Sequence, residues 1–153
     1  MSKVIQNIFK AAAVQFDIRL GDVDANLSYV LAEIKRLSKQ GVKLIVLPEM
    51  WSTGYAWRKL GKLSERTPEI LQELKKDSGK GTVIIGSMPE KDGEEIYNTA
   101  YVIDSGKVTG RYRKIHLFTP MKEDFFLKAG NEPLLCNTSV GKIGVLICYD
   151  VRF

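Results

Sequence analysis

The stretch Val42-Lys43-Leu44-Ile45-Val46-Leu47, which runs directly into Pro48-Glu49, indicates how this chain folds. Apart from Lys43 the stretch is apolar, and a short apolar run is typical of a strand buried on both faces of a sheet. Gly41 precedes it and is suited to end a helix, because glycine readily adopts the left-handed backbone conformation. We therefore expect a buried strand over residues 42–47 that presents the Glu49 carboxylate at its end.

The segment before this strand has the clearest helical pattern in the chain. Its apolar side chains recur at helical spacing, at Leu27, Val30, Leu31, Ile34 and Leu37. Asp24 is a suitable N-cap for this helix. Further towards the N-terminus, the apolar run 9–16 ends in the polar loop 17–24 and predicts another buried strand.

The segments after residue 49 continue the alternation of helix and strand. A helix is expected from Pro68 to about Ser78, with Thr67 as its cap and Gly79 at its end. Residues 82–87 predict a strand, and two more flank the turn Asp104-Ser105-Gly106-Lys107 as a hairpin. These hairpin strands are expected over 96–103 and 108–113, and two later strands over 134–136 and 143–148.

This order of elements predicts an α/β fold. Early strand–helix alternation favours a parallel or mixed sheet with helices on one face. If the other face of the sheet is also apolar, a second layer must cover it. Polar groups at the ends of buried strands are then the candidates for a functional site, because open α/β sheets place their sites there.

Composition narrows the class of protein. The 153 residues are enough for one domain, and 44% hydrophobic, 27% charged and 9% aromatic residues are ordinary for a soluble globular chain. No apolar run is long enough to span a bilayer. Gln6, Asn7 and Lys10 interrupt the segment that a signal peptide would need to be apolar. We expect a cytoplasmic protein that does not associate with membranes.

Two cysteines and one histidine argue against a disulfide framework and against a zinc site, so we expect no metal and no cofactor.

The net charge of +5 raises the alternative of RNA binding through the basic run 111–114 and the aromatic residues Tyr112 and Phe118. The other Lys and Arg residues are scattered among 18 acidic residues, and short basic runs are usually solvated surfaces. We therefore expect no nucleic-acid partner.

Three places combine a strand end with a reactive side chain. The first is Glu49, a carboxylate at the mouth of the sheet that could accept protons. The second is the run 112–118, which contains Lys114 and His116; we expect His116 to be a hydrogen-bonding scaffold residue rather than a base. The third is the run 144–150, in which an apolar strand delivers Cys148 into a polar turn, as in the nucleophile elbow of other hydrolases. Cys136 lies within a strand and reads as a small buried apolar residue.

Segments at these three places resemble the three signature segments of the nitrilase superfamily of carbon–nitrogen hydrolases, in the same order. They are Leu47-Pro48-Glu49, Tyr112-Arg113-Lys114-Ile115-His116-Leu117 and Cys148-Tyr149-Asp150-Val151-Arg152-Phe153. The opening Ala13-Val14-Gln15-Phe16 and the loop up to Asn26 also resemble the start of that family. The resemblance covers essentially the whole chain. It implies half of an α-β-β-α sandwich and identifies residues 1–153 as a carbon–nitrogen hydrolase domain that is incomplete at its C-terminus.

The resemblance also implies the roles of the site residues. Cys148 would attack an amide carbonyl and form a thioester with release of ammonia, and Glu49 would move the protons. Lys114 would stabilise the oxyanion together with the backbone N–H of Tyr149, and Glu123 would be an accessory glutamate that orients Lys114 and the substrate. A nearby ammonium is expected to lower the pKa of the Cys148 thiol.

Shorter segments are similar to the omega-amidase branch, which hydrolyses omega-amides of 2-oxo acids such as 2-oxoglutaramate. They are Pro48-Glu49-Met50 followed by Thr53-Gly54-Tyr55, and Glu123 followed by Lys128-Ala129-Gly130-Asn131. The implied partner is therefore a small amide substrate, and the implied assembly a homo-oligomer. An N-carbamoyl amide hydrolase or a nitrilase of the same superfamily is an alternative, and so is a non-catalytic, truncated interaction module.

Overall fold

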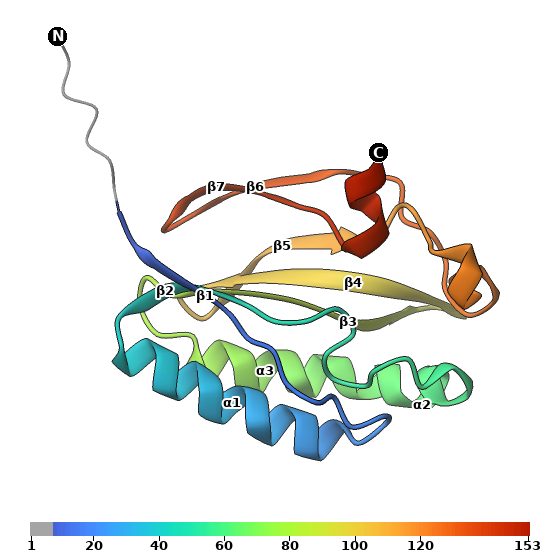
Figure 1. Ribbon diagram of the computed structural model, residues 1–153, viewed down its shortest axis with the longest axis horizontal. Helices are drawn as coiled ribbons and strands as arrows, with labels where there is room; N and C mark the ends of the chain where they lie inside the picture. Colours follow the sequence, from blue (N-terminus) through green and yellow to red (C-terminus); the bar gives the residue numbers. More distant parts are fainter. Residues whose placement is uncertain (1–7) are drawn as a thin grey trace, which may run out of the picture.

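The computed structural model describes residues 8–153, whose central layer is a five-stranded sheet (Figure 1). Its strands, in the spatial order β1-β2-β3-β4-β5, are β1 (Lys10–Ala13), β2 (Val42–Val46), β3 (Val83–Asp92), β4 (Glu95–Asp104) and β5 (Lys107–Arg113). β1, β2 and β3 run parallel, whereas β3, β4 and β5 pair antiparallel. The expected α/β class with a mixed sheet is confirmed.

Two helices, α1 (Val23–Lys39) and α3 (Thr67–Asp77), cover one face of this sheet (Figure 1). Val30 and Ile34 of α1 and Ile70 of α3 are fully buried and belong to one core cluster with Ile45 of β2 and Ile84 of β3. Burying each such side chain contributes roughly 1.5–3 kcal/mol. The short elements η1 (Trp57–Lys59), α2 (Leu60–Leu63) and η2 (Ser64–Arg66) connect β2 to α3.

A two-stranded antiparallel sheet of β6 (Leu134–Thr138) and β7 (Gly141–Val145) lies over the opposite face. Its inward side chains Cys136 and Val145 share a second core cluster with Val83, Val102 and Tyr112 of the large sheet. The layers therefore follow the order helices, sheet, sheet, which is the expected half of an α-β-β-α sandwich. Three short 3-10 helices complete the chain: η3 (Thr119–Met121), η4 (Glu123–Phe125) and η5 (Cys148–Arg152).

Two strands are less buried than the sequence indicated. The strand expected over 9–16 ends at Ala13, and most of its residues are exposed because β1 is the edge strand of the sheet. In β2, Lys43 and Val46 are exposed, so the expected burial on both faces is wrong. Val46 opens onto a cavity instead of packing against the second sheet.

The helix caps also differ from expectation. Asp22, rather than Asp24, caps α1, since its Oδ1 accepts a hydrogen bond from the Ala25 N–H at 3.1 Å. Thr67 is the first residue of α3 and does not cap it, because its hydroxyl donates to the Pro89 carbonyl at 2.6 Å. As predicted, α1 ends just before Gly41, whose φ is +76°.

The strand boundaries show one hairpin that the sequence analysis missed. β3 extends to Asp92 and pairs with β4 across a turn at Gly93, whose φ is +60°. The predicted hairpin of β4 and β5 is confirmed, with Ser105 and Gly106 at positive φ in its turn. β7 stops at Val145 instead of continuing to residue 148.

Within residues 8–153, no helix combines the length and the apolar character that a bilayer crossing requires. The expectation that a signal sequence is absent depends partly on Gln6 and Asn7, which lie outside the described residues.

Candidate active site

A buried ammonium group between two carboxylates forms the centre of the site. The Nζ of Lys114 lies 2.8 Å from Oε1 of Glu49, and 3.0 and 2.9 Å from the two carboxylate oxygens of Glu123. The side chain of Lys114 is 0% exposed and that of Glu123 is 2% exposed. The structure thus brings Lys114 to Glu49 across 65 residues and to the nearby Glu123, and each of the three was predicted for the site.

The charge on Lys114 is stabilised by these contacts. Burial by itself disfavours the ammonium form, but the ion pairs with Glu123 and Glu49 raise the pKa of Lys114 above its usual value. The residue is therefore a fixed cation at neutral pH. Removing either carboxylate would leave part of a buried charge without compensation, which is costly inside a protein.

Glu49 lies just beyond β2 in a tight turn. The next residue, Met50, has a φ of +52°, and its N–H donates to Ser87 Oγ of β3 at 2.9 Å. A Cβ on Gly86 would lie 2.7 Å from the Cβ of Leu47 and 2.9 Å from Trp51. Glycine at 86 therefore lets the turn pack closely against β3, and this contact sets the position of the carboxylate.

Two further side chains hold Glu49, and the sequence analysis assigned a role to neither. Asn98 Nδ2 of β4 donates to Glu49 Oε1 at 2.8 Å, and the Tyr55 hydroxyl donates to Oε2 at 2.9 Å. Asn98 is fully buried in a strand that is otherwise mostly apolar. A polar residue within an apolar strand was the signal in the sequence that Asn98 could have a role in the site. Its partner, 49 residues away, could not be read from the sequence.

The Lys114 backbone is anchored on both sides. Its N–H donates to the Asn98 carbonyl at 2.9 Å, and its carbonyl accepts from the Gly130 N–H at 2.8 Å. A Cβ on Gly130 would collide with the carbonyl oxygen of Arg113. Residue 130 must therefore be glycine for the loop after η4 to close over Lys114.

Cys148 is the first residue of η5 and follows β7 after the two connecting residues 146 and 147. Its backbone φ is +47°, a value that residues other than glycine rarely adopt. Cys148 is exposed to solvent. Cys148 and Glu49 line the same cavity of about 200 Å³, together with Val46, Ser87 and Ile147 among others. The predicted nucleophile and the predicted base therefore face one space.

The pKa of the Cys148 thiol is raised, contrary to the expectation that Lys114 would lower it. Partial desolvation is the largest cause, and the negative charge of the adjacent Glu49 carboxylate adds to it. Lys114 acts in the expected direction but is outweighed, because two carboxylates surround it. The resting thiol is protonated at neutral pH, so attack requires a base to remove its proton.

Asp150 fastens the turn that carries Cys148 to the Lys114 segment. Its carboxylate accepts hydrogen bonds from the Ile147 N–H at 2.9 Å, the His116 N–H at 2.8 Å and the Tyr112 hydroxyl at 2.7 Å. Burial alone would raise the pKa of Asp150, but these donors and His116 Nδ1 lower it. We call Asp150 with its donors the Asp150 clamp. The sequence analysis quoted this residue within a motif but gave it no role.

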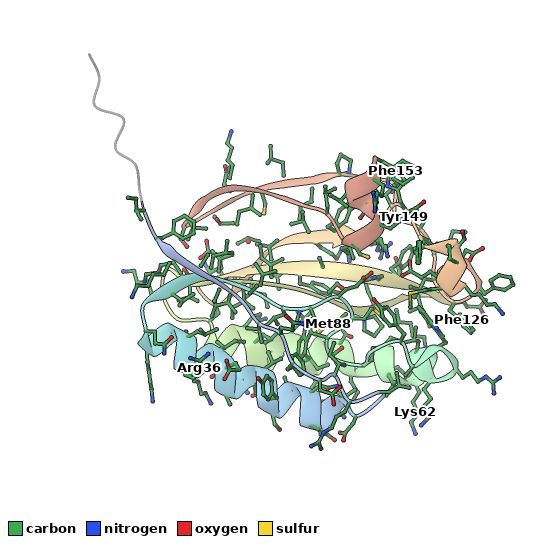
Figure 2. All side chains as sticks on the ribbon, viewed as in Figure 1. Arg36, Lys62, Met88, Phe126, Tyr149 and Phe153 are labelled. Carbon is green, nitrogen blue, oxygen red and sulfur yellow. The ribbon has the colours of Figure 1, made fainter. Side chains whose placement is uncertain are left out.

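His116 and Tyr149 lie beside the turn that carries Cys148. His116 Nδ1 lies 3.0 Å from Asp150 Oδ1, so the histidine acts as a scaffold residue, as expected. Its ring stacks on Phe153 at 4.0 Å between centroids. Figure 2 shows Tyr149 and Phe153 together at the C-terminal segment, and their rings meet edge to face at 5.5 Å. Tyr149 follows Cys148 directly, which places its backbone N–H next to the thiol.

Cys136 is separate from this site. It lies in β6 within the second core cluster, and burial raises its pKa. Among residues 8–153, no group of three or more His, Cys, Asp or Glu side chains is arranged to hold a metal ion. The site that Cys148, Glu49, Glu123 and Lys114 form offers a thiol, two carboxylates and a fixed ammonium.

Comparison with known sequences shows the family to which the chain is similar. The sequence model of the family described as "Carbon-nitrogen hydrolase" matches residues 10–153. A protein from Pyrococcus abyssi named nitrilase is 35% identical over 94% of this chain and 57% of its own length. The 2-oxoglutaramate amidase of Bacillus subtilis is 36% identical over 93% of this chain and 56% of its own length.

Comparison with solved structures supports the fold. Nit3 of Saccharomyces cerevisiae, a member of branch 10 of the nitrilase superfamily, superposes with a TM-score of 0.84 and is 33% identical. The match covers 95% of this chain and 57% of that structure. The chain thus spans about half the length of the proteins that it matches.

Proposed function

Since the chain belongs to the carbon–nitrogen hydrolase family, we propose that Glu49, Lys114 and Cys148 form the catalytic set of an amidase. The observation that carries the proposal is the buried Lys114 ammonium, which contacts Glu49 and Glu123 while Glu49 shares a cavity with Cys148. A cation fixed by two carboxylates is costly to bury for stability alone. It is well suited to stabilise negative charge in a reaction.

In the first half of the reaction, the Cys148 thiol gives its proton to Glu49 and its sulfur attacks the amide carbonyl carbon. A C–S bond forms, and the carbonyl electron pair moves to oxygen. Lys114 and the Tyr149 N–H stabilise this oxyanion. Preorganised donors of this kind are worth a few kcal/mol each, as measured for single oxyanion-hole donors in other enzymes.

The tetrahedral intermediate then collapses. Glu49 passes its proton to the amide nitrogen, the C–N bond breaks and ammonia leaves, which gives a thioester on Cys148. Glu49 next takes a proton from water, and the hydroxide attacks the thioester carbonyl. The C–S bond then breaks, Glu49 returns the proton to the Cys148 sulfur, and the carboxylic acid product leaves. One carboxylate serves as base and acid in turn.

Glu123 is proposed as a positioning residue. It accepts two contacts from Lys114 Nζ and one hydrogen bond from the Phe118 N–H at 2.8 Å. These contacts fix the ammonium and the loop of η3 and η4 relative to each other. Glu123 therefore acts on the reaction through Lys114.

For the substrate we propose an omega-amide of a 2-oxo dicarboxylic acid. The name of the Bacillus subtilis relative and the omega-amidase-like segments of this sequence support it. An N-carbamoyl amide or a nitrile substrate is the alternative within the same chemistry, and the Pyrococcus abyssi relative is named a nitrilase. A non-catalytic interaction module is the alternative from another class.

The test is ammonia release by the native protein from 2-oxoglutaramate, an N-carbamoyl amino acid and a simple nitrile. Glu49→Gln and Lys114→Ala should each lower turnover by about a hundredfold or more, the usual scale for losing a base or an oxyanion donor. Glu94→Gln and Lys107→Ala, at exposed positions, are the matched controls. Near-normal turnover in either site variant would show that its assigned role is wrong, and no release from any substrate would favour the interaction module.

Self-association and a cytoplasmic location remain predictions. Light scattering from the purified native protein tests the first, and fractionation of cells tests the second.

A further inference from the structure

A second cavity, of about 440 Å³, shares no lining residue with the cavity of Glu49 and Cys148. Its walls come from η1 and the two residues before it, from Leu20 in the loop before α1, and from Met121, Lys122 and Phe126 around η3 and η4. In Figure 2 this end of the molecule carries the labelled Phe126 and Lys62. The volume lies within the range of cavities that bind small organic molecules, roughly 300–1,000 Å³.

Three aromatic side chains line this cavity together with the apolar residues Leu20, Ala56 and Met121. The rings of Trp57 and Phe126 are stacked, with centroids 5.3 Å apart and planes at 11°. Tyr55 meets Trp57 at 5.2 Å. Such an arrangement offers a flat surface on which a planar apolar group can pack.

Three cations complete the wall: Arg58, Lys59 and Lys122. Each is exposed, and none forms a salt bridge with any residue in the described range 8–153. No carboxylate lines the cavity. Like charges without local partners create a positive potential that concentrates anions.

Lys122 joins η3 to η4 with a φ of +58°, a backbone conformation that residues other than glycine rarely adopt. The conformation puts Lys122 on the cavity wall, while the next residue, Glu123, reaches Lys114.

We infer that this cavity is a separate binding site for a small organic anion with a flat apolar body, of the class of aromatic carboxylates. The aromatic wall would hold the flat body, and Arg58, Lys59 and Lys122 would hold the carboxylate. This goes beyond the proposed amidase function, because binding here requires neither Cys148 nor turnover.

Tyr55 connects the two cavities. Its ring lines the aromatic cavity, and its hydroxyl donates to Glu49. An occupant that packs on this ring acts on the position of the carboxylate through one hydrogen bond. The binding site would therefore also bias the catalytic site.

The experiment uses the native protein, with benzoate as the anionic probe and benzyl alcohol as its neutral counterpart. Binding is followed by the fluorescence of Trp57, taken as the difference between wild type and Trp57→Phe. Trp57 is half-buried in the cavity wall, whereas Trp51 is fully buried elsewhere. Benzoate should change this signal saturably, with a Kd lower than that of benzyl alcohol by about tenfold or more.

The double variant Lys59→Gln/Lys122→Gln should weaken benzoate binding by about tenfold, and added salt should do the same. Lys62→Gln, an exposed lysine outside the cavity wall, should leave it unchanged. Cys148→Ala should also bind benzoate normally, which separates this site from the amidase proposal. Equal affinity for benzyl alcohol, no saturable signal, or an unchanged Kd for benzoate in the double variant would overturn the inference.

Discussion

Replacing Asp150 with asparagine perturbs the contact that positions the candidate nucleophile. Asp150 Oδ2 accepts from both the Ile147 N–H and the Tyr112 hydroxyl, and Oδ1 accepts from the His116 N–H. An amide keeps one oxygen acceptor but places an NH₂ group against donors on the other side. The Tyr112 hydroxyl can rotate to accept from it, whereas the Ile147 N–H loses its partner.

The magnitude follows from these contacts. A hydrogen bond to a charged group contributes roughly 1.5–3 kcal/mol, and an unpaired buried donor costs roughly 1–3 kcal/mol. Asp150 is 2% exposed, so water does not replace the lost partner. We therefore expect Asp150→Asn to lower the free energy of unfolding by about 3 kcal/mol. Turnover should fall by about a hundredfold, because a displacement near 1 Å of a reacting group has that scale.

The pH dependence has a definite sign. The pKa of Asp150 in the folded protein is lowered below its usual value of 3.8. Its contribution to stability is therefore fully present above about pH 3.8, and it is lost as the pH falls from there through the folded-state pKa. The difference between wild type and Asp150→Asn should shrink in that acidic window and stay constant between pH 5 and pH 7.

Equilibrium unfolding in urea of the native protein and its variants, at pH 7 and at stepwise lower pH, measures both effects. Asp124→Asn is the control, because Asp124 is exposed and accepts no hydrogen bond from a side chain within the described chain. If Asp150→Asn unfolds within about 0.5 kcal/mol of wild type at pH 7, the range of ordinary surface substitutions, the Asp150 clamp does not hold the turn.

Three further predictions concern the thiols, the accessory glutamate and the isolated chain. Iodoacetamide should label the exposed Cys148 well before the buried Cys136, as peptide mapping of the inactivated protein would show. A label found on Cys136 alone would contradict this prediction. Glu123→Gln should lower turnover by about tenfold or more, because Lys114 loses one of the two carboxylates that fix it; steady-state ammonia release measures it, and unchanged turnover would refute the positioning role. Residues 1–153 expressed alone should self-associate and release no ammonia, because β7 pairs only with β6 within the described chain and its other edge is free; a soluble, active monomer in size-exclusion chromatography would contradict it.

The layers and the strand ends were predictable because they depend on local pattern. The period of apolar residues in α1 fixes its buried face, and the apolar run 42–47 places Glu49 at the end of β2. The turn residues Ser105 and Gly106 likewise predict the hairpin of β4 and β5. Burial was harder to predict, since Val46 is exposed although it lies in an apolar run.

The contacts that fasten the site were not predictable, because they join residues far apart in the sequence. Asn98 reaches Glu49 across 49 residues and Asp150 reaches Tyr112 across 38. No local pattern specifies such pairs. The pKa of Cys148 illustrates the same limit: its direction depends on the balance of Glu49 against Lys114, and that balance is set by tertiary geometry.

The proposed acyl-enzyme can be detected from the mass of the Cys148 peptide after rapid acid quenching during turnover of 2-oxoglutaramate by the native protein. We expect a peptide that carries the acyl group of the substrate as a thioester on Cys148, and no such adduct in Cys148→Ala. Ammonia release without any adduct on Cys148, or with the acyl group on another residue, would contradict this expectation.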